Sequence, residues 1–375
     1  MPAYLKIIAY HLPQFHPIAE NSQWWGAGFT EWRNVARARP LFWGHQQPNI
    51  PGELGFYDLR LHETRVEQAE LAAWAGIDAF CYYHYWFAGK LLLERPLELL
   101  LAENQPTFPF CLCWANHDWT GHWAGTNEML IQQTYPGVDD HRRHYEYLRR
   151  FFDDPRYLRI GGKPMLAIHK PKDIPEWQRL ANLLQEWAYA DRFGGIFLVG
   201  LESDRSLLSH GFSAIAPHSL NLALNSYLKG TRRWLQAARQ KLLKYPRWTI
   251  PYEQFCEHFE NHAYDGITIL PTAIPNWDNT PRIGRRGVVI SHSSPSAFQK
   301  HLSRSIRGMQ LGNGANETIL IIKSWNEWAE GNYLEPDLKW GRGWLEAVRN
   351  FRSDTERTPI GCPDVPQSQR LATSA

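Results

Sequence analysis

The sequence lacks the features that mark several common classes of protein. Its five cysteines include no C-x-x-C pair, which argues against a zinc ribbon or a thioredoxin-type redox site. No apolar run is long enough to span a bilayer, and no signal peptide precedes the first strand pattern. The formal net charge of +2 gives no field that would attract nucleic acid. We therefore expect a cytoplasmic protein with buried free thiols and no nucleic-acid partner.

The catalytic fingerprints of several enzyme classes are missing as well. There is no P-loop, no serine nucleophile elbow, no H-E-x-x-H motif and no G-x-G-x-x-G sequence after the first predicted strand. The 16 histidines suggest a metal site, but His141 and His144 lie among neighbours that indicate the surface face of a helix. His11 and His16 match the H-x-H pair of barrel metallohydrolases poorly. We expect no metal and no cofactor, and a metal site is the weaker alternative.

What the chain does contain is a regular alternation of short apolar runs and amphipathic segments. Such alternation predicts parallel strands connected by helices. Eight runs favour an α/β fold of the (β/α)8 TIM-barrel type, with long inserted loops, over a doubly wound sheet. We expect one domain over residues 1–353 and a loose polar tail over residues 354–375. The expected strands are Leu5–Tyr10, Ile77–Tyr83, Phe108–Trp114, Pro164–His169, Ile196–Leu201, Ala214–Pro217, Ile267–Leu270 and Ile319–Ile322. The expected helices are Glu63–Ala75, Asp139–Phe152, Pro175–Arg192, Pro295–Gln310 and Trp340–Phe351.

Two insertions interrupt this alternation. Residues near 21–57 are rich in tryptophan, glycine and proline, which is typical of a structured loop with a functional role. Residues near 221–262 contain a basic stretch, 229–247, that has no acid. A basic amphipathic helix can contact an anionic membrane surface, but a solvated helix is the plainer interpretation of this stretch. Peripheral membrane contact is therefore an alternative that the sequence leaves open.

Polar and aromatic side chains recur at corresponding places, at or just after the ends of the predicted strands. In a barrel the loops at the carboxyl ends of all eight strands meet at one mouth. Each residue alone could be an ordinary hydrogen-bonded loop residue, but their repeated placement indicates a shared polar and aromatic site. These residues are His11, His84, Trp86, Asn116, His169, Glu202, His218, Trp277, Asp278 and Glu327.

Glu327 and Glu330 follow the last predicted strand in the aromatic sequence WNEWAEG. Two acids at this spacing also occur on exposed helix faces, but here tryptophan, glycine and tyrosine surround them instead of lysine and arginine. Glycosidic chemistry needs one protonated and one ionised carboxyl group, and aromatic rings suit the apolar faces of sugars. If the segment is a helical turn, the two Cβ atoms lie about 5–6 Å apart, which is close enough for a mechanism that retains configuration.

Six stretches spread over nearly the whole chain carry a resemblance to a known family. They are YHLPQFH (10–16), WWGAGFTEWRN (24–34), CYYHYWF (81–87), FCLCWAN (110–116), WDNTPR (277–282) and WNEWAEGNYLEP (325–336). With them the chain resembles the WbsX-type proteins of bacterial polysaccharide gene clusters, which carry a domain similar to glycoside hydrolase family 99. The resemblance implies a (β/α)8 barrel. One departure is the third strand end, WANHDW, where His117 replaces the usual glutamate.

Family 99 enzymes are retaining, endo-acting α-mannosidases and mannanases whose paired acids lie in a W-N-E-W-x-E motif. By position, the resemblance implies that Glu327 is the base on the sugar 2-hydroxyl, which gives a 1,2-anhydro sugar. Glu330 would be the acid that protonates the leaving oxygen and then activates water. The matching stretches imply further substrate contacts at Trp32, Trp114, Trp325, Asn326, Trp328, Tyr333 and Glu335. His117 and Asp118, at the third strand end where the chain departs from the family, are expected substrate contacts as well.

The residues and the resemblance together predict a carbohydrate-active enzyme. It would cleave or remodel a glycosidic bond in a bacterial surface polysaccharide or its lipid-linked precursor, so its expected partner is an oligosaccharide or polysaccharide. Two alternatives stay open. WbsX-type proteins are usually described as glycosyltransferases, and a transferase using a nucleotide sugar needs a diphosphate site, of which the sequence gives no clear example. A glycan-binding protein without activity is the other, and the intact acid pair argues against it.

Overall fold

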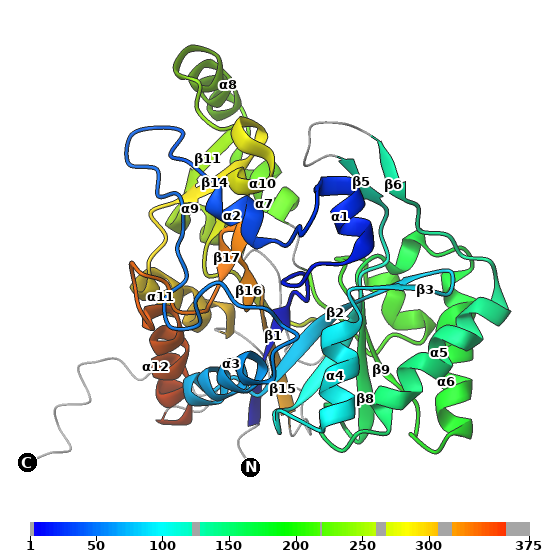
Figure 1. Ribbon diagram of the computed structural model, residues 1–375. Coiled ribbons are helices and arrows are strands. Elements are labelled where there is room, and N and C mark those ends of the chain that lie inside the picture. Colours follow the sequence, from blue (N-terminus) through cyan, green and yellow to red (C-terminus); the bar gives the residue numbers. More distant parts are fainter. Residues whose placement is uncertain (1–3, 122–127, 218–219, 260–267, 307–316, 358–375) are drawn as a thin grey trace, which may run out of the picture.

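The computed structural model contains a curled sheet of parallel strands surrounded by helices (Figure 1). The structure describes residues 4–121, 128–217, 220–259, 268–306 and 317–357. Neighbouring strands pair in the order β10-β9-β8-β4-β2-β1-β15-β12, and each of these pairings is parallel. These strands are β1 (Tyr4–His11), β2 (Ala79–Phe87), β4 (Phe110–Trp114), β8 (Lys163–Ile168), β9 (Phe197–Gly200), β10 (Ala214–Ile215), β12 (Thr272–Ala273) and β15 (Glu317–Ile322).

A backbone bridge joins the two ends of this path. Ile215 of β10 donates a hydrogen bond to the carbonyl of Thr268 at 2.7 Å and accepts one from the amide of Leu270 at 2.8 Å. The stretch that contains these residues continues into β12, which pairs with β15. The predicted barrel fold is therefore confirmed. Its seventh strand is irregular, because the run expected at Ile267–Leu270 supplies only this bridge, and Ile267 lies outside the described residues.

Helices cover the outside of the sheet, mostly where the sequence places them (Figure 1). The predicted tail is wrong at its start, because α12 continues through Asp354 to Arg357. The expected helix at Pro295–Gln310 is described only as far as Ile306. The helices are α1 (Ala19–Trp25), α2 (Trp32–Ala36), α3 (His62–Ala75), α4 (Arg95–Glu103), α5 (Val138–Phe152), α6 (Trp177–Ala190), α7 (Leu220–Tyr227), α8 (Thr231–Leu243), α9 (Tyr252–Phe259), α10 (Thr280–Ile283), α11 (Pro295–Ile306) and α12 (Gly343–Arg357).

The second insertion builds a small core of its own. Strand β11 (Trp248–Pro251) pairs in parallel with β14 (Val288–Ser291), which pairs antiparallel with β13 (Trp277–Asp278). Side chains of α7, α9 and this sheet form a buried apolar cluster that is separate from the main core. Helix α8 projects from this region at the top of the molecule (Figure 1). None of the helices in the described part of the chain is long and apolar enough to cross a membrane.

Short elements complete the fold. Those beside the barrel are β3 (Lys90–Leu92), β5 (Trp119–Thr120), β6 (Met129–Ile131), β7 (Arg159–Ile160), η2 (Pro171–Asp173) and η3 (Arg205–His210). Those near the last strands are η4 (Gly284–Arg286), β16 (Asn326–Glu327), η5 (Trp328–Glu330) and β17 (Asn332–Tyr333).

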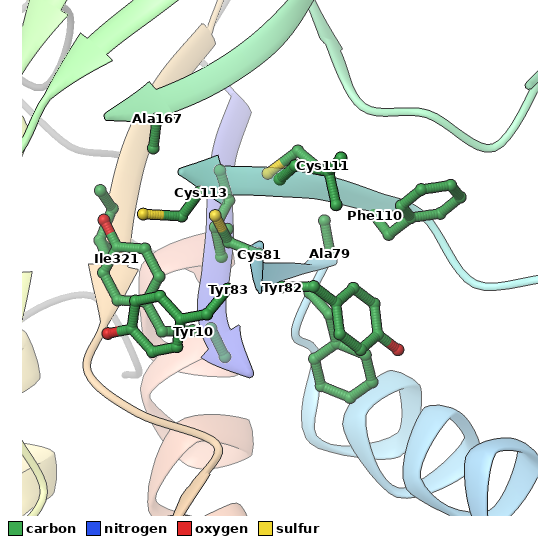
Figure 2. Close-up of a cluster of buried hydrophobic side chains, with 14 of the residues drawn as sticks. Tyr10, Ala79, Cys81, Tyr82, Tyr83, Phe110, Cys111, Cys113, Ala167 and Ile321 are labelled. Atoms are coloured by element: carbon green, nitrogen blue, oxygen red, sulfur yellow. The ribbon is translucent and has the colours of Figure 1, made fainter. Parts of the chain in front are cut away.

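The two faces of strand β2 have different surroundings (Figure 2). Tyr83 points toward Tyr10 of β1, and their rings stack at 5.4 Å. Tyr82, one residue earlier, points the other way, as Phe110 of β4 does. This follows from the two-residue repeat of a strand, which sends successive side chains to opposite faces. The expectation of buried free thiols is confirmed for the four described cysteines, Cys81, Cys111, Cys113 and Cys256.

Candidate active site

A cleft of about 950 Å³ opens where the barrel strands end, at the edge where barrel enzymes keep their sites. Its volume lies in the range of ligand pockets in proteins. Loops from most of the strands contribute to it, and the two insertions add Trp25 and Leu220. Polar and aromatic residues on its wall include Gln14, Tyr83, Tyr85, His117, Asp118, His169, Glu202, Trp277, Arg282, Lys323, Glu327 and Glu330.

Glu327 and Glu330 reach this cleft from a tight hairpin after β15. Glu327 ends β16, which pairs with β17 through Asn332, and Glu330 ends the single turn of η5. The hairpin turns at Gly331, whose φ of 55° lies in the left-handed region that favours glycine. A Cβ atom at this position would meet the backbone nitrogen of Asp278 at 2.8 Å. The close packing therefore fixes the turn, and with it the direction of both acids.

Three further buried charges surround the pair. Lys323 Nζ lies 2.9 Å from a carboxylate oxygen of Glu327 and 3.7 Å from one of Glu330. Arg282 contacts Glu330 directly and donates from Nε to Glu31 at 2.7 Å. The cluster thus holds three carboxyl groups against two fixed positive charges. One proton retained on a carboxyl group makes the cluster neutral, and a neutral cluster is the least costly to bury.

Glu330 is the group that keeps this proton. Burial, together with the negative charge of Glu327, raises the pKa of Glu330 to about 8. Arg282 opposes this rise, but its positive charge is shared with the fully buried Glu31. Burial alone would also raise the pKa of Glu327, but the charge of Lys323 and the hydrogen bond from Glu330 outweigh it and lower the pKa to about 2. Near neutral pH the pair therefore holds one ionised and one protonated carboxyl group.

A fourth acid, the buried Glu335, holds the segment that carries the pair. It accepts hydrogen bonds from Tyr57 at 2.9 Å, Gln68 at 2.6 Å and the indole of Trp328 at 2.5 Å. Burial raises its pKa to about 7 despite these bonds. Glu335 is not among the described residues that line the cleft, so its contacts fit a positioning role for the segment that carries Glu327 and Glu330.

The structure brings some of the predicted site residues together on the wall of the cleft. Besides the two acids these are His117, Asp118, His169, Glu202 and Trp277. The rings of His117 and His169 meet edge to face at 5.2 Å. Burial, with the charge of Lys170, lowers the pKa of His117 to about 4. The imidazole of His117 is therefore neutral near pH 7 and can donate or accept a hydrogen bond. His218 lies outside the described residues.

Four predicted residues at strand ends face the surrounding helices instead of the mouth. His11 contacts Gln68 of α3 at 3.2 Å. His84 contacts His144 of α5 at 2.9 Å. The indole of Trp86 donates to Asp140 of α5, and Trp114 packs against His144. The strand β2 runs on to Phe87, so strand alternation turns His84 and Trp86 outward. The structure also corrects the surface face expected around His144, because this side chain is buried.

The other residues predicted to contact substrate bond to or pack against residues within the fold, and they are not part of the described lining of the cleft. Asp278 accepts from Gln47 and contacts His45, both at 2.7 Å. Asn326 accepts from the amide of Leu12 at 2.7 Å, and Asn116 accepts from the amide of Lys170 at 2.8 Å. The remaining members, Trp32, Trp325, Trp328 and Tyr333, are buried. These contacts fit a role in shaping the walls of the cleft.

Sequence reasoning missed four residues at the centre of the site. Tyr83 and Tyr85 line the cleft because they alternate with His84 on the strand. Lys323 directly follows β15, and Arg282 lies inside the WDNTPR stretch. The place of Lys323 just after the last strand was the available signal for that residue. Among the described residues, no group of three or more His, Cys, Asp and Glu side chains could hold a metal ion.

Comparison with known proteins places this chain in a family. The sequence profile described as Glycosyltransferase WbsX matches residues 7–348. The chain belongs to the WbsX family. It is also 38% identical over 351 residues to the protein named Uncharacterized protein WxcX from Xanthomonas campestris pv. campestris. That match covers 92% of this chain and 49% of the relative, so the chain spans about half the length of the curated relatives it matches.

Solved structures show which fold this WbsX family member has. The endo-alpha-mannosidase of glycoside hydrolase family 99 from Bacteroides thetaiotaomicron superimposes with a TM-score of 0.56 at 14% identity. The match covers 94% of this chain and 97% of that enzyme. A glycoside hydrolase-like protein gives a TM-score of 0.57 at 13% identity, covering 94% of each chain. These likenesses confirm the expected family 99-like barrel.

Proposed function

We propose that this WbsX family member is a carbohydrate-active enzyme that cleaves or remodels a glycosidic bond with retention of configuration. The observation that carries the proposal is the pair of acids on the wall of one cleft, Glu327 with a pKa of about 2 and Glu330 with a pKa of about 8. Glycoside chemistry needs this division between an ionised and a protonated carboxyl group. Both acids contact the same ammonium of Lys323, so they lie close together, as a retaining mechanism requires.

In the first step Glu327 removes the proton of the sugar 2-hydroxyl, and that oxygen bonds to the anomeric carbon. The bond from the anomeric carbon to the leaving oxygen breaks, and Glu330 gives its proton to that oxygen. A 1,2-anhydro sugar results, as the resemblance to family 99 implies. In the second step Glu330 takes a proton from water, which opens the anhydro ring at the anomeric carbon. Glu327 then returns its proton to the 2-oxygen, so two inversions retain the configuration.

The surrounding charges support both steps. Lys323 and Arg282 contact the acids directly, so they can balance the negative charge whichever carboxyl group carries it. Tyr83, Tyr85 and Trp277 bring aromatic rings to the same cleft, where they can stack on the apolar faces of sugar rings. The WbsX family and the family 99-like fold support a glycan in a bacterial surface polysaccharide, or its lipid-linked precursor, as the substrate.

Transfer to a sugar acceptor is the second candidate function, because the family is described as a glycosyltransferase. The same anhydro sugar can be opened by an acceptor hydroxyl instead of water, with Glu330 as the base in either case. Incubating the protein with oligosaccharides, with and without a nucleotide sugar, separates the possibilities. Shorter products indicate hydrolysis, longer products without nucleotide indicate remodelling, and products that need the nucleotide sugar indicate a conventional transferase.

Two single substitutions test the division of roles. Glu330→Gln should lower turnover of a natural glycan by about 10²–10⁴-fold, the usual loss for a general acid–base group. An aryl glycoside with an acidic leaving group needs no proton, so bond cleavage by this variant should be largely restored. Glu327→Gln should stay inactive on both substrates, because the 2-hydroxyl still has to lose its proton.

Glu317→Gln provides the matched control. Glu317 opens the same strand β15 at its far end, where it pairs with Lys6 at 3.3 Å, and its loss should leave turnover unchanged. Rescue of Glu327→Gln instead of Glu330→Gln would reverse the two roles. Full activity of both variants would show that Glu327 and Glu330 take no part in the reaction. Membrane contact through segment 229–247, which the sequence leaves open as an alternative, is independent of this chemistry and is proposed separately.

A further inference from the structure

Helix α8 carries three of its four large apolar side chains on the face that points away from the protein. Gln236 is its buried residue, and it donates to the carbonyl of Thr249 at 2.7 Å. Trp234, Leu235 and Leu242 are 80%, 63% and 76% exposed. Their spacing puts them on one helix face, with Ala238 between them and Gln236 on the other side. A surface helix normally turns its apolar stripe toward the core. In α8 the stripe faces the solvent instead.

Positive charge flanks this stripe. Lys241 lies on the same side of the helix as Trp234, two turns further along, and Arg239 lies one turn after Leu235, as the 3.6-residue repeat requires. The sequence has no acid anywhere between residues 205 and 252. Other exposed basic residues on α8 or close to it in sequence are Lys229, Arg232, Arg233, Lys244 and Arg247.

Loop 37–45 extends the same surface. Phe42 stacks on Tyr245, directly after α8, with ring centroids 4.5 Å apart. The neighbouring Trp43 is 98% exposed, and the loop carries no acid. Arg285 of η4 joins loop and insertion, because it donates to the carbonyl of Leu41 and accepts from the amide of Arg247. We use the name α8 face for Trp43, Trp234, Leu235, Ala238, Leu242 and the basic residues around them.

We propose that the α8 face docks the protein on an anionic lipid bilayer. Exposed tryptophan and leucine on one side of a helix can enter the boundary between headgroups and acyl chains, while flanking lysine and arginine contact anionic headgroups. Tryptophan in particular favours this interface. A nucleic acid could bind the positive charges, but it would not explain the exposed leucines. The apolar stripe therefore favours lipid as the partner.

Docking in this way places the cleft toward the membrane side. Figure 1 shows α8 at the end of the molecule toward which β1 runs from the amino terminus. The cleft opens at the same ends of the strands. A glycan held at the membrane by a lipid would thus be presented to the mouth of the barrel. Membrane docking itself does not depend on the chemistry proposed for Glu327 and Glu330.

Sedimentation with lipid vesicles tests the proposal on the whole chain. Vesicles of phosphatidylcholine with about 30% phosphatidylglycerol should pull down the protein, whereas pure phosphatidylcholine should pull down at least tenfold less. Raising the salt from 0.1 M to 0.5 M should release most of it, because exposed charges are screened. Equal binding to both vesicle types, or no binding to either, would overturn the proposal.

Two variants probe the stripe and the charges separately. Trp234→Gln with Leu242→Gln should abolish pull-down, and Arg239→Gln with Lys241→Gln should weaken it at least tenfold. Leu338→Gln is the matched control, because Leu338 is 73% exposed outside the α8 face, and its binding should equal wild type. Circular dichroism should show unchanged folding, since all of these side chains are exposed.

The same variants also test whether another partner, a second copy of the chain or a nucleic acid, binds the α8 face. If wild type is a dimer by light scattering and Trp234→Gln with Leu242→Gln is a monomer, the stripe is a contact between two copies and the lipid proposal is wrong. If single-stranded RNA displaces the vesicles and binds the stripe variant as tightly as wild type, the basic residues serve nucleic acid instead. Vesicle binding that survives in both variants would place the membrane contact elsewhere on the chain.

Discussion

Replacing Lys323 with methionine should move both limbs of the pH–activity profile to higher pH. Lys323→Met keeps an unbranched apolar stem but removes the charge that lies 2.9 Å from Glu327 and 3.7 Å from Glu330. A unit charge at about 4 Å is worth roughly 4 kcal/mol at an effective dielectric constant near 20, which corresponds to about 3 pKa units. Loss of a positive neighbour raises the pKa of an acid. The pKa of Glu327 should therefore rise from about 2 to about 5.

The consequence for activity follows from the roles of the two acids. The ionised Glu327 is the base, so kcat/KM should begin to fall below about pH 5 in the variant, whereas wild type stays active well below that. The pKa of Glu330 should rise above its wild-type value of about 8, so the alkaline limb moves upward too. Carbon-13 NMR of protein labelled at the glutamate carboxyl carbons gives the same two pKa values without a substrate.

Lys170→Met is the control for this experiment. Lys170 also lines the cleft, but its ammonium is half-exposed and pairs with Asp173 at 3.5 Å. Its removal should leave both limbs of the pH–activity profile within a few tenths of a pH unit of their wild-type positions. Unchanged limbs in Lys323→Met, or a shift of either limb to lower pH, would refute the assignment of Glu327 as the ionised base held by Lys323.

Two further substitutions test the same cluster. Glu31→Gln removes a fully buried negative charge, so the pKa of Glu330 should fall and the alkaline limb of kcat/KM should move below about pH 8; an upward shift would contradict the charge balance. Gly331→Ala should lower the melting temperature and turnover more than Gly341→Ala, because the two positions share a φ near 55° but only the first meets a neighbouring backbone. Equal effects of the two alanines in thermal unfolding would show that close packing does not fix the turn.

Patterns along the chain were enough to predict the strand count, the order of elements and the place of the acid pair. Each buried parallel strand appears as a continuous apolar run, because both of its faces are covered, and the helices between the runs repeat with their own period. The hairpin with Glu327 and Glu330 follows directly from the end of β15. Aromatic neighbours without lysine or arginine already distinguished this pair from an exposed helix face.

The set of side chains that face the cleft became clear only in the folded chain. In a strand that is buried on both faces, polarity does not alternate along the sequence, so the run CYYHYWF gave no sign that Tyr83 and Tyr85 face the cleft and His84 faces a helix. Besides the nearby Lys323, the charges around the acids come from distant segments, since Arg282 links Glu31 to Glu330. Their charges set the two pKa values only once folding has buried them together, because desolvation and Coulomb forces depend on distance in space and not on spacing along the chain.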